Sequence, residues 1–216
     1  MKILIINPNS DTAMTRVIAR TAKRYAADDF EVACLSAPGA PKFIETYQDE
    51  AGAAPGMIRL VRENEKSCDA FIVACHCDPN LDFLKEITDK PVVGIGEASM
   101  KIASMLGDIF SVISSTGHSV PNKKALVRKY HLREALASVR VAEDGDYLKA
   151  ARAAVKEDGA EVIVLGCAGM TGLDKRLQAR LGVPVLDGVV CGLMIASGLA
   201  RGGVSTSKVR RYAGRR

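Results

Sequence analysis

The feature that most constrains the fold of this chain is an alternation of short apolar runs with amphipathic stretches, which occurs twice along the sequence. Short apolar runs bounded by Gly, Pro or polar residues are typical of buried strands, and the amphipathic stretches are typical of helices. The pattern predicts strands over 2–6, 31–36, 70–75 and 91–96, and again over 109–115, 137–143, 161–167 and 183–188. It predicts helices over 16–26, 53–67, 81–88, 123–131, 146–158, 172–182 and 189–203. Strands that alternate with helices form parallel sheets, so the predicted fold class is α/β.

The two halves of the chain match each other segment by segment. CDAFIVAC (68–75) matches AEVIVLGC (160–167), and the polar loops after the first strand of each half also correspond. We therefore expect two similar lobes, each with a four-stranded parallel sheet flanked by helices, related by a pseudo-two-fold axis. Residues 1–98 and 189–216 would form the first lobe and residues 99–188 the second. Ligands of open α/β sheets bind at the carboxyl ends of strands, so the active site is expected in the cleft between the lobes.

Composition and charge narrow the class of function. Aromatic residues make up 5% of the chain and Trp is absent, so the core must be aliphatic. The net charge of +5 is mild, and the basic segment 207–216 is predicted to be solvated because no nucleic-acid-binding motif accompanies it. The chain opens without a signal peptide, and no apolar stretch reaches the ~18 residues of a membrane span. We expect a cytoplasmic protein whose partner is a small-molecule substrate, not a nucleic acid or a membrane.

The stretch Cys-His-Cys-Asp at 75–78 has three interpretations: a metal site, a redox pair or a single reactive thiol. A zinc site needs about four ligands, yet on an extended segment His76 would point away from Cys75 and Cys77, and the sequence has no second cluster. Redox pairs normally read Cys-x-x-Cys. A metal-binding or redox protein remains the alternative of another functional class. Of the six cysteines, buried structural thiols are predicted at Cys34, Cys68 and Cys191.

Cys75 and Cys167 each end the third predicted strand of their half, so a pseudo-two-fold axis would bring them face to face across the cleft. Two opposed thiols suit the inversion of a carbon acid, because a thiolate removes a proton from one face and a thiol returns one to the other. Cysteine has a reference pKa of ~8.5, which lies within reach of neutral pH when the surroundings lower it. Polar groups of the first-strand loops would flank the same cleft, among them Asn9, Ser10, Ser114 and Ser115.

These residues belong to a wider pattern that resembles the aspartate/glutamate racemase superfamily, most closely its hydantoin racemase branch, which includes allantoin racemases. The similarity spans nearly the whole chain, in the segments INPNSDTAMT (6–15), FIETYQDE (43–50), VACHCDPNLD (73–82), PVVGIGEASM (91–100), FSVISSTGHSVP (110–121), EDGAEVIVLGCAGM (157–170), GVPVLDGV (182–189) and TSKVRRYA (206–213). The cysteine segments followed by Asp-Pro and by Ala-Gly-Met are the most specific part of it.

The resemblance implies racemisation of 5-monosubstituted hydantoins, with allantoin among the candidate substrates, by a homo-oligomer that uses no cofactor and no metal. Cys75 and Cys167 match the family's two catalytic cysteines. The backbone N–H groups of His76 and Ala168 are expected donors to the developing enolate. Groups that bind the substrate are expected at Asn9, Ser10, His76, Ser114, Ser115, Gly166 and Ala168.

The chain departs from the family pattern beside the first catalytic cysteine and at the end of the fifth predicted strand. The branch usually has an aromatic residue where this chain has His76, and paired threonines where it has Ser114 and Ser115. These changes leave both thiols in place but leave the substrate open, since a more polar pocket favours a ureido or an acidic substituent. An aspartate/glutamate-type amino-acid racemase or a related isomerase remains an alternative, and the role of Cys77 is undecided.

Overall fold

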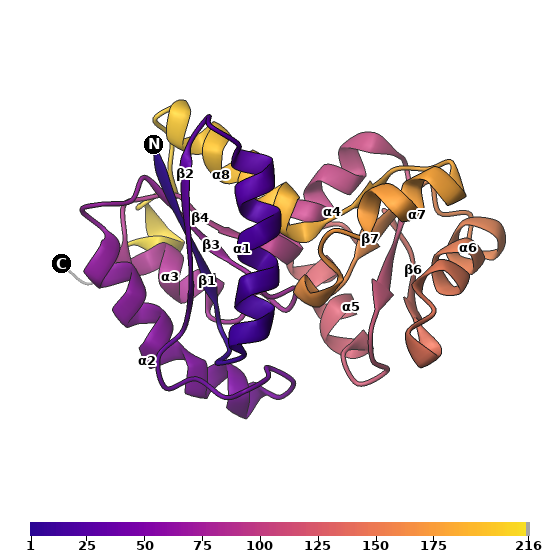
Figure 1. Ribbon diagram of the computed structural model, residues 1–216, viewed down its shortest axis with the longest axis horizontal. Helices are drawn as coiled ribbons and strands as arrows, with labels where there is room; N and C mark the ends of the chain where they lie inside the picture. The colour runs from indigo at the N-terminus through magenta and orange to yellow at the C-terminus, as the bar shows by residue number, and fades with distance from the viewer. Residues whose placement is uncertain (215–216) are drawn as a thin grey trace.

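In the computed structural model, which describes residues 1–214, the strands form two separate four-stranded sheets. The sheets have the orders β2-β1-β3-β4 and β6-β5-β7-β8, and every pairing is parallel. The first sheet contains β1 (Lys2–Asn7), β2 (Glu31–Ser36), β3 (Ala70–Val73) and β4 (Val92–Gly94). The second contains β5 (Phe110–Ser114), β6 (Leu136–Val141), β7 (Val162–Leu165) and β8 (Val185–Leu186). The predicted α/β fold with two four-stranded parallel sheets is confirmed, and Figure 1 shows the two halves side by side.

Helices flank both sheets. The first half contains α1 (Thr12–Ala26), α2 (Tyr47–Asn64), α3 (Leu81–Ile87) and α4 (Ile95–Leu106). The second half contains α5 (Val120–Lys129), α6 (Tyr147–Glu157) and α7 (Asp174–Leu181), with 3-10 turns η1 (Glu143–Gly145) and η2 (Ala168–Met170). The last long helix, α8 (Gly188–Arg201), returns to the first sheet, where it packs on α1, α4 and β3, and the 3-10 turn η3 (Arg210–Tyr212) follows it.

The strands bury both faces, as the continuous apolar runs in the sequence require. Successive side chains of β1 point to opposite faces, so Ile3 and Ile5 pack with α1, α4 and α8 while Leu4 and Ile6 pack with α2 and α3. Two further clusters cover the faces of the second sheet. The aliphatic side chains therefore pack into four clusters, one on each face of the two sheets, instead of a single aromatic core.

The predicted helix ranges leave out one helix, although GIGEAS (94–99) indicates a strand-to-helix turn. The strand expected over 91–96 ends at Gly94, and α4 begins at once with Ile95. Gly94 is the N-cap and offers no side chain to the first turn, so the local sequence carries no helix start signal. The hydrogen bonds that satisfy this first turn come from a different loop, which is described below.

The basic segment near the C-terminus lies on α3 instead of extending freely into solvent. The Lys208 ammonium donates to the carbonyls of Lys85 and Glu86 at 2.6 and 3.0 Å, at the C-terminal end of α3. Arg211 and Tyr212 bind Asp82, each at 2.9 Å. The segment's last two residues, Arg215 and Arg216, lie outside the described residues.

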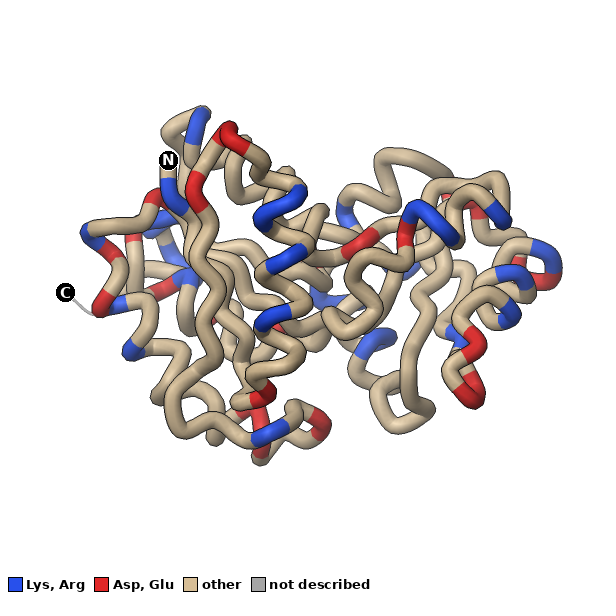
Figure 2. The backbone as a smooth tube through the Cα atoms, in the orientation of Figure 1, with Lys and Arg blue, Asp and Glu red and all other residues tan. Residues whose placement is uncertain are grey.

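Charged residues are distributed over both lobes. Figure 2 shows Lys and Arg positions interspersed with Asp and Glu positions along the helices and loops of each half. Within residues 1–214, none of the helices combines the length and the apolarity that crossing a membrane demands.

Candidate active site

The first reactive segment is the loop between β3 and α3. The predicted strand over 70–75 ends at Val73, so Cys75, His76 and Cys77 lie in a turn, not on an extended strand. The turn closes with a bond of 3.0 Å from the Asp78 N–H to the Cys75 carbonyl, and Asp78 has a φ of 48°. Because the segment is turned, the strand-like alternation that would send His76 away from its neighbours does not apply.

The second reactive segment is the equivalent loop between β7 and η2. Cys167 has extended backbone angles, and its Sγ accepts a hydrogen bond of 3.4 Å from the Gly169 N–H. Gly166 packs very tightly, since a Cβ there would lie 2.6 Å from the Ile113 carbonyl oxygen and 3.0 Å from Lys123 Cε. A larger residue at 166 would therefore push β7 away from β5 or displace the Lys123 side chain.

The two loops open onto one cavity of about 130 Å³. Its walls come from both lobes, as expected for the cleft of a duplicated α/β protein. It is lined by Asn9, Met14, Phe43, Ile44, Glu45, Ala74, Cys75, His76, Cys77, Ser119, Lys123, Gly166, Cys167 and Ala168. The cavity thus gathers three thiols, a neutral amide and a lysine among apolar side chains.

Of the predicted site residues, Cys75, Cys167, Asn9, His76, Gly166 and Ala168 line this cavity. The remaining three lie elsewhere. Ser10 is exposed, and its N–H donates to the Pro41 carbonyl at 2.9 Å. Ser114 is fully buried and bonds to the Ser119 hydroxyl at 2.6 Å, and Ser115 is exposed. In the second-lobe loop it is Ser119, not Ser114, that borders the cavity.

Sequence reasoning assigned no role to several residues of the cavity wall. Phe43, Ile44 and Glu45 come from the loop before α2 and belong to the FIETYQDE segment, which the family resemblance already marked. The sequence does not indicate a site role for Lys123, because this residue belongs to the polar run Asn-Lys-Lys at the start of α5, which is typical of a solvated helix face. In the fold its side chain is almost fully buried.

The thiols of the first loop differ in their electrostatic surroundings. A hydrogen bond to Cys77 and burial raise the pKa of Cys75 well above its ordinary value. The same bond from Cys75, together with the positive charge of Lys123, lowers the pKa of Cys77 to about 7 although burial opposes it. Within this pair, the positive charge of Lys123 favours the thiolate form at Cys77.

His76 is neutral and buried. Burial first, and then the Lys123 charge, lower the pKa of its imidazole well below the ordinary value. The Ser99 hydroxyl donates to the Ile95 carbonyl at 2.7 Å, so at 3.3 Å it accepts from Nε2–H of His76. This assigns the proton to Nε2 and leaves Nδ1 as a buried acceptor, which has no partner among the described residues.

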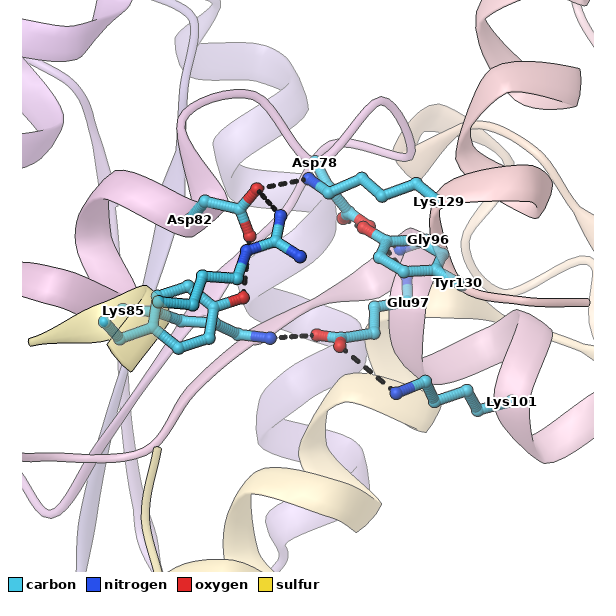
Figure 3. A network of polar contacts seen from close by, with 10 residues as sticks. Asp78, Asp82, Lys85, Gly96, Glu97, Lys101, Lys129 and Tyr130 are labelled. Atoms are coloured by element: carbon cyan, nitrogen blue, oxygen red, sulfur yellow. Dashed lines mark hydrogen bonds and ion pairs between the residues drawn. The ribbon is translucent and has the colours of Figure 1, made fainter. Parts of the chain in front are cut away.

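Asp78 holds the first loop against α4 and against the second lobe. Its carboxylate accepts from the N–H groups of Gly96 and Glu97 at 3.0 and 2.7 Å, and from the Tyr130 hydroxyl at 2.5 Å. Figure 3 shows this carboxylate beside Tyr130, with Asp82 bound to Lys129, and Glu97 bound to Lys85 and Lys101. Burial raises the pKa of Asp78 to about 6, although these hydrogen bonds lower it.

A larger cavity of about 550 Å³ lies on the other side of the first loop. Cys77 borders both cavities. The larger one is otherwise formed by Asp78 and Asn80 of the same loop and by α2, α3 and α5, with Tyr47, Phe83 and Lys129 in its wall. It contains neither Cys75 nor Cys167, so the two thiols equivalent by topology belong to the smaller cavity. Within residues 1–214, no three His, Cys, Asp or Glu side chains are grouped so as to hold a metal ion.

Comparison with known proteins places this arrangement in a family. Residues 3–196 match the model of the family described as Asp/Glu/hydantoin racemase. A hydantoin racemase of Pseudomonas sp. (strain NS671) is 39% identical over 98% of this chain and 91% of that protein. The structure of allantoin racemase from Pseudomonas fluorescens superposes with a TM-score of 0.94 at 34% identity, covering 100% of this chain and 97% of that one. Allantoin racemase from Klebsiella pneumoniae gives 0.92 at 33% identity over 100% and 94%.

Proposed function

The chain belongs to the Asp/Glu/hydantoin racemase family, and on that premise we propose that it is a cofactor-independent racemase of 5-monosubstituted hydantoins, allantoin among them. Proteins that match it over nearly the full length include hydantoin racemases and allantoin racemases. The chain is accordingly an isomerase of the racemase class, and its substrate is a small cyclic amino-acid derivative. Racemisation takes place at C5, the carbon next to the C4 carbonyl.

The observation that carries the proposal is that Cys75 and Cys167 line one cavity from equivalent positions in the two lobes. Inversion at C5 needs a base on one face of the ring and an acid on the other. One sulfur takes the C5 proton as a thiolate, and the other returns a proton to the opposite face as a thiol. The roles exchange when the other enantiomer binds.

The remaining groups of the cavity hold the ring and the charge that develops on it. Loss of the C5 proton places negative charge on the C4 oxygen, where the backbone N–H groups of His76 and Ala168 act as donors. Asn9 and Gly166 contact the polar edge of the ring. This assignment is supported by their position in the cavity wall. The apolar Met14, Phe43 and Ile44 receive the substituent at C5.

The proposed enzyme works in the cytoplasm as a homo-oligomer. All six cysteines are free, which suits a reducing compartment. Apolar side chains exposed on α4 and α8 support an association of copies, with Met105 79% and Met194 47% exposed. Light scattering after size-exclusion chromatography measures the oligomeric state directly.

The test is proton exchange at C5 in D₂O, with single enantiomers of allantoin, 5-benzylhydantoin and glutamate as substrates and no added metal or cofactor. We expect optical rotation to decay while deuterium enters C5 of a hydantoin. Cys75→Ser and Cys167→Ser should each lower racemisation by about 10²-fold or more, because general acid–base groups contribute that much. Each variant should impair exchange from one enantiomer more than from the other.

Cys34→Ser is the matched control, since Cys34 is a partly buried thiol of β2 outside the cavity. It should racemise as the unaltered protein does. Full activity in both active-site variants would refute the two-thiol mechanism. Exchange on glutamate but on neither hydantoin would assign the chain to amino-acid racemases instead.

A further inference from the structure

Lys123 is a buried cation in the wall of the cysteine cavity. It comes from the first turn of α5, and its side chain is 2% exposed. Its Nζ donates to the Gly166 carbonyl at 2.6 Å, one residue before Cys167. The absence of a side chain at Gly166 is what admits the lysine, because a Cβ there would lie 3.0 Å from Lys123 Cε.

No carboxylate balances this charge. Among residues 1–214, the ion pairs within 4.0 Å do not include Lys123. Asp78 directs its carboxylate to Tyr130 and the first turn of α4. Glu45 lines the cavity but is exposed and makes no ion pair with Lys123, and Glu50 borders the other cavity. A buried ammonium without a partner is costly, so the site requires a negative charge from another source.

The groups left in the cavity that can become anions are thiols. His76 is a neutral imidazole and supplies no charge, whereas Cys75, Cys77 and Cys167 share the cavity with the lysine. We infer that Lys123 is the counter-ion of a thiolate that Cys75 and Cys77 share before substrate binds. The lowered pKa of Cys77, which the hydrogen bond from Cys75 and the charge of Lys123 produce, agrees with this assignment.

This role rests on the proposed racemase function and completes its proton balance. In the free enzyme the negative charge rests on Cys77, whose sulfur accepts a hydrogen bond from the Cys75 thiol. When substrate binds, the Cys75 proton passes to Cys77, and the Cys75 thiolate takes the proton from C5. Cys167 gives its proton to the opposite face and becomes the thiolate. After the product leaves, Cys77 releases a proton to water and Cys167 takes one up, which restores the free enzyme. Lys123, bound to the carbonyl next to Cys167, stays close to the negative charge at both ends of this transfer.

Lys123 is thus a positioning residue that acts through the thiols, and its effect is measurable without substrate. The ultraviolet absorbance of thiolates is followed as the pH of the intact protein is raised. In the unaltered protein we expect one thiolate to appear with an apparent pKa near 7. In Lys123→Met and Lys123→Gln this titration should move up by at least about one pH unit, which corresponds to about ten-fold less thiolate at a given pH below the pKa.

Lys124→Met is the matched control, because Lys124 neighbours Lys123 in α5 but is exposed. Its titration should be unchanged. Lys123→Gln retains a hydrogen-bond donor without the charge, so a purely structural role predicts that Gln restores the titration where Met does not. An unchanged titration in the folded Met and Gln variants, with circular dichroism as the check of folding, overturns the inference.

Cys77→Ser tests the other half of the pair and covers the case in which both Lys123 variants fail to fold. The titration near neutral pH should disappear or move up, and its persistence would overturn the inference. The racemase assay separates the inference from the proposed function. If hydantoins are racemised, the acid limb of the pH profile of kcat/KM should shift to higher pH in Lys123→Met. If they are not, the thiolate titration still decides the role of Lys123.

Discussion

The loop that carries Cys75 is bound to α4, and the loop that carries Cys167 is bound to α8. In both lobes a carboxylate makes this contact, but in one lobe it comes from the loop and in the other from the helix. In the first lobe the carboxylate belongs to the cysteine loop: Asp78 accepts from the second and third residues of α4, Gly96 and Glu97. In the second lobe the carboxylate is the N-cap of the helix. Asp187 accepts from the second and third residues of α8 and, at 2.5 and 2.8 Å, from the hydroxyl of Thr171 and the N–H of Gly172 in the cysteine loop.

Both carboxylates meet the same need, because the first N–H groups of a helix lack acceptors within the helix and attract a negative charge. The position of the carboxylate is common to the two lobes, whereas the residue that supplies it is not. Gly94 is the N-cap of α4, and a Cβ there would lie 2.3 Å from an oxygen of Asp78, so the Asp78 carboxylate fills the space that an N-cap side chain would take. A duplicated topology thus preserves an electrostatic contact without preserving the residue that supplies the accepting carboxylate.

Removing either carboxylate should give the largest effect on stability. Asp78→Gly, chosen because Asp78 has a φ of 48°, and Asp187→Ala should each lower the free energy of unfolding by about 3 kcal/mol, because each leaves several buried donors without an acceptor. Urea unfolding measures both. Asp11→Ala, at the N-cap of α1, is the control for loss of an ordinary cap, at about 1 kcal/mol. If Asp78→Gly costs no more than this control, Asp78 does not fasten the loop.

The raised pKa of Asp78 should be visible as a pH dependence of the free energy of unfolding. Its pKa is raised by burial from 3.8 to about 6 in the folded protein. Between these two pH values the unfolded chain releases the proton first, so stability decreases as the pH rises from about 4 to about 6, by up to about 3 kcal/mol. Asp78→Asn removes this contribution. The destabilisation by Asp78→Asn, measured by urea unfolding across this range, should therefore be largest near pH 4 and shrink as the pH rises; a constant difference would contradict the raised pKa.

Local sequence patterns were enough to predict the sheets and the positions of Cys75 and Cys167 after equivalent strands, whereas the catalytic role of the two thiols stays a prediction. Strand periodicity depends on residues close together in the chain, and the continuous runs around Ile3 and Ile163 read as buried strands whatever packs on them. Parallel topology then places the residues after β3 and β7 at the carboxyl ends of the sheets, where Cys75 and Cys167 are found. The division of the chain into lobes at residues 98 and 188 stays a prediction.

The rest of the site depends on contacts between distant segments. Lys123 and Lys124 are indistinguishable in the sequence, and only the absence of a side chain at Gly166, in another strand–loop unit, makes room to bury the first of them. The range of α4 was not predicted for the same reason, because the acceptor of its first N–H groups is Asp78, which precedes Gly96 by 18 residues. The packing that buries Ser114 and brings Ser119 to the cavity likewise has no local signal.

The smallest effect is expected from moving the carboxylate of the first lobe to the position it has in the second. Gly94→Asp alone should destabilise the protein, because the new side chain would overlap the Asp78 carboxylate. In the Asp78→Gly background the same substitution should stabilise it by about 1 kcal/mol, since the backbone at 94 has φ −86° and ψ 142°, which suit an aspartate N-cap.

Urea unfolding of the four proteins in this double-mutant cycle measures the reversal of sign directly. Recovery should be partial, because an aspartate at 94 belongs to the strand–helix junction and does not hold the loop that carries Cys75. The Tyr130 hydroxyl, which now donates to Asp78, also loses its acceptor. If Gly94→Asp destabilises both backgrounds equally, the two carboxylates are not equivalent, and the likeness between the lobes ends at the strands.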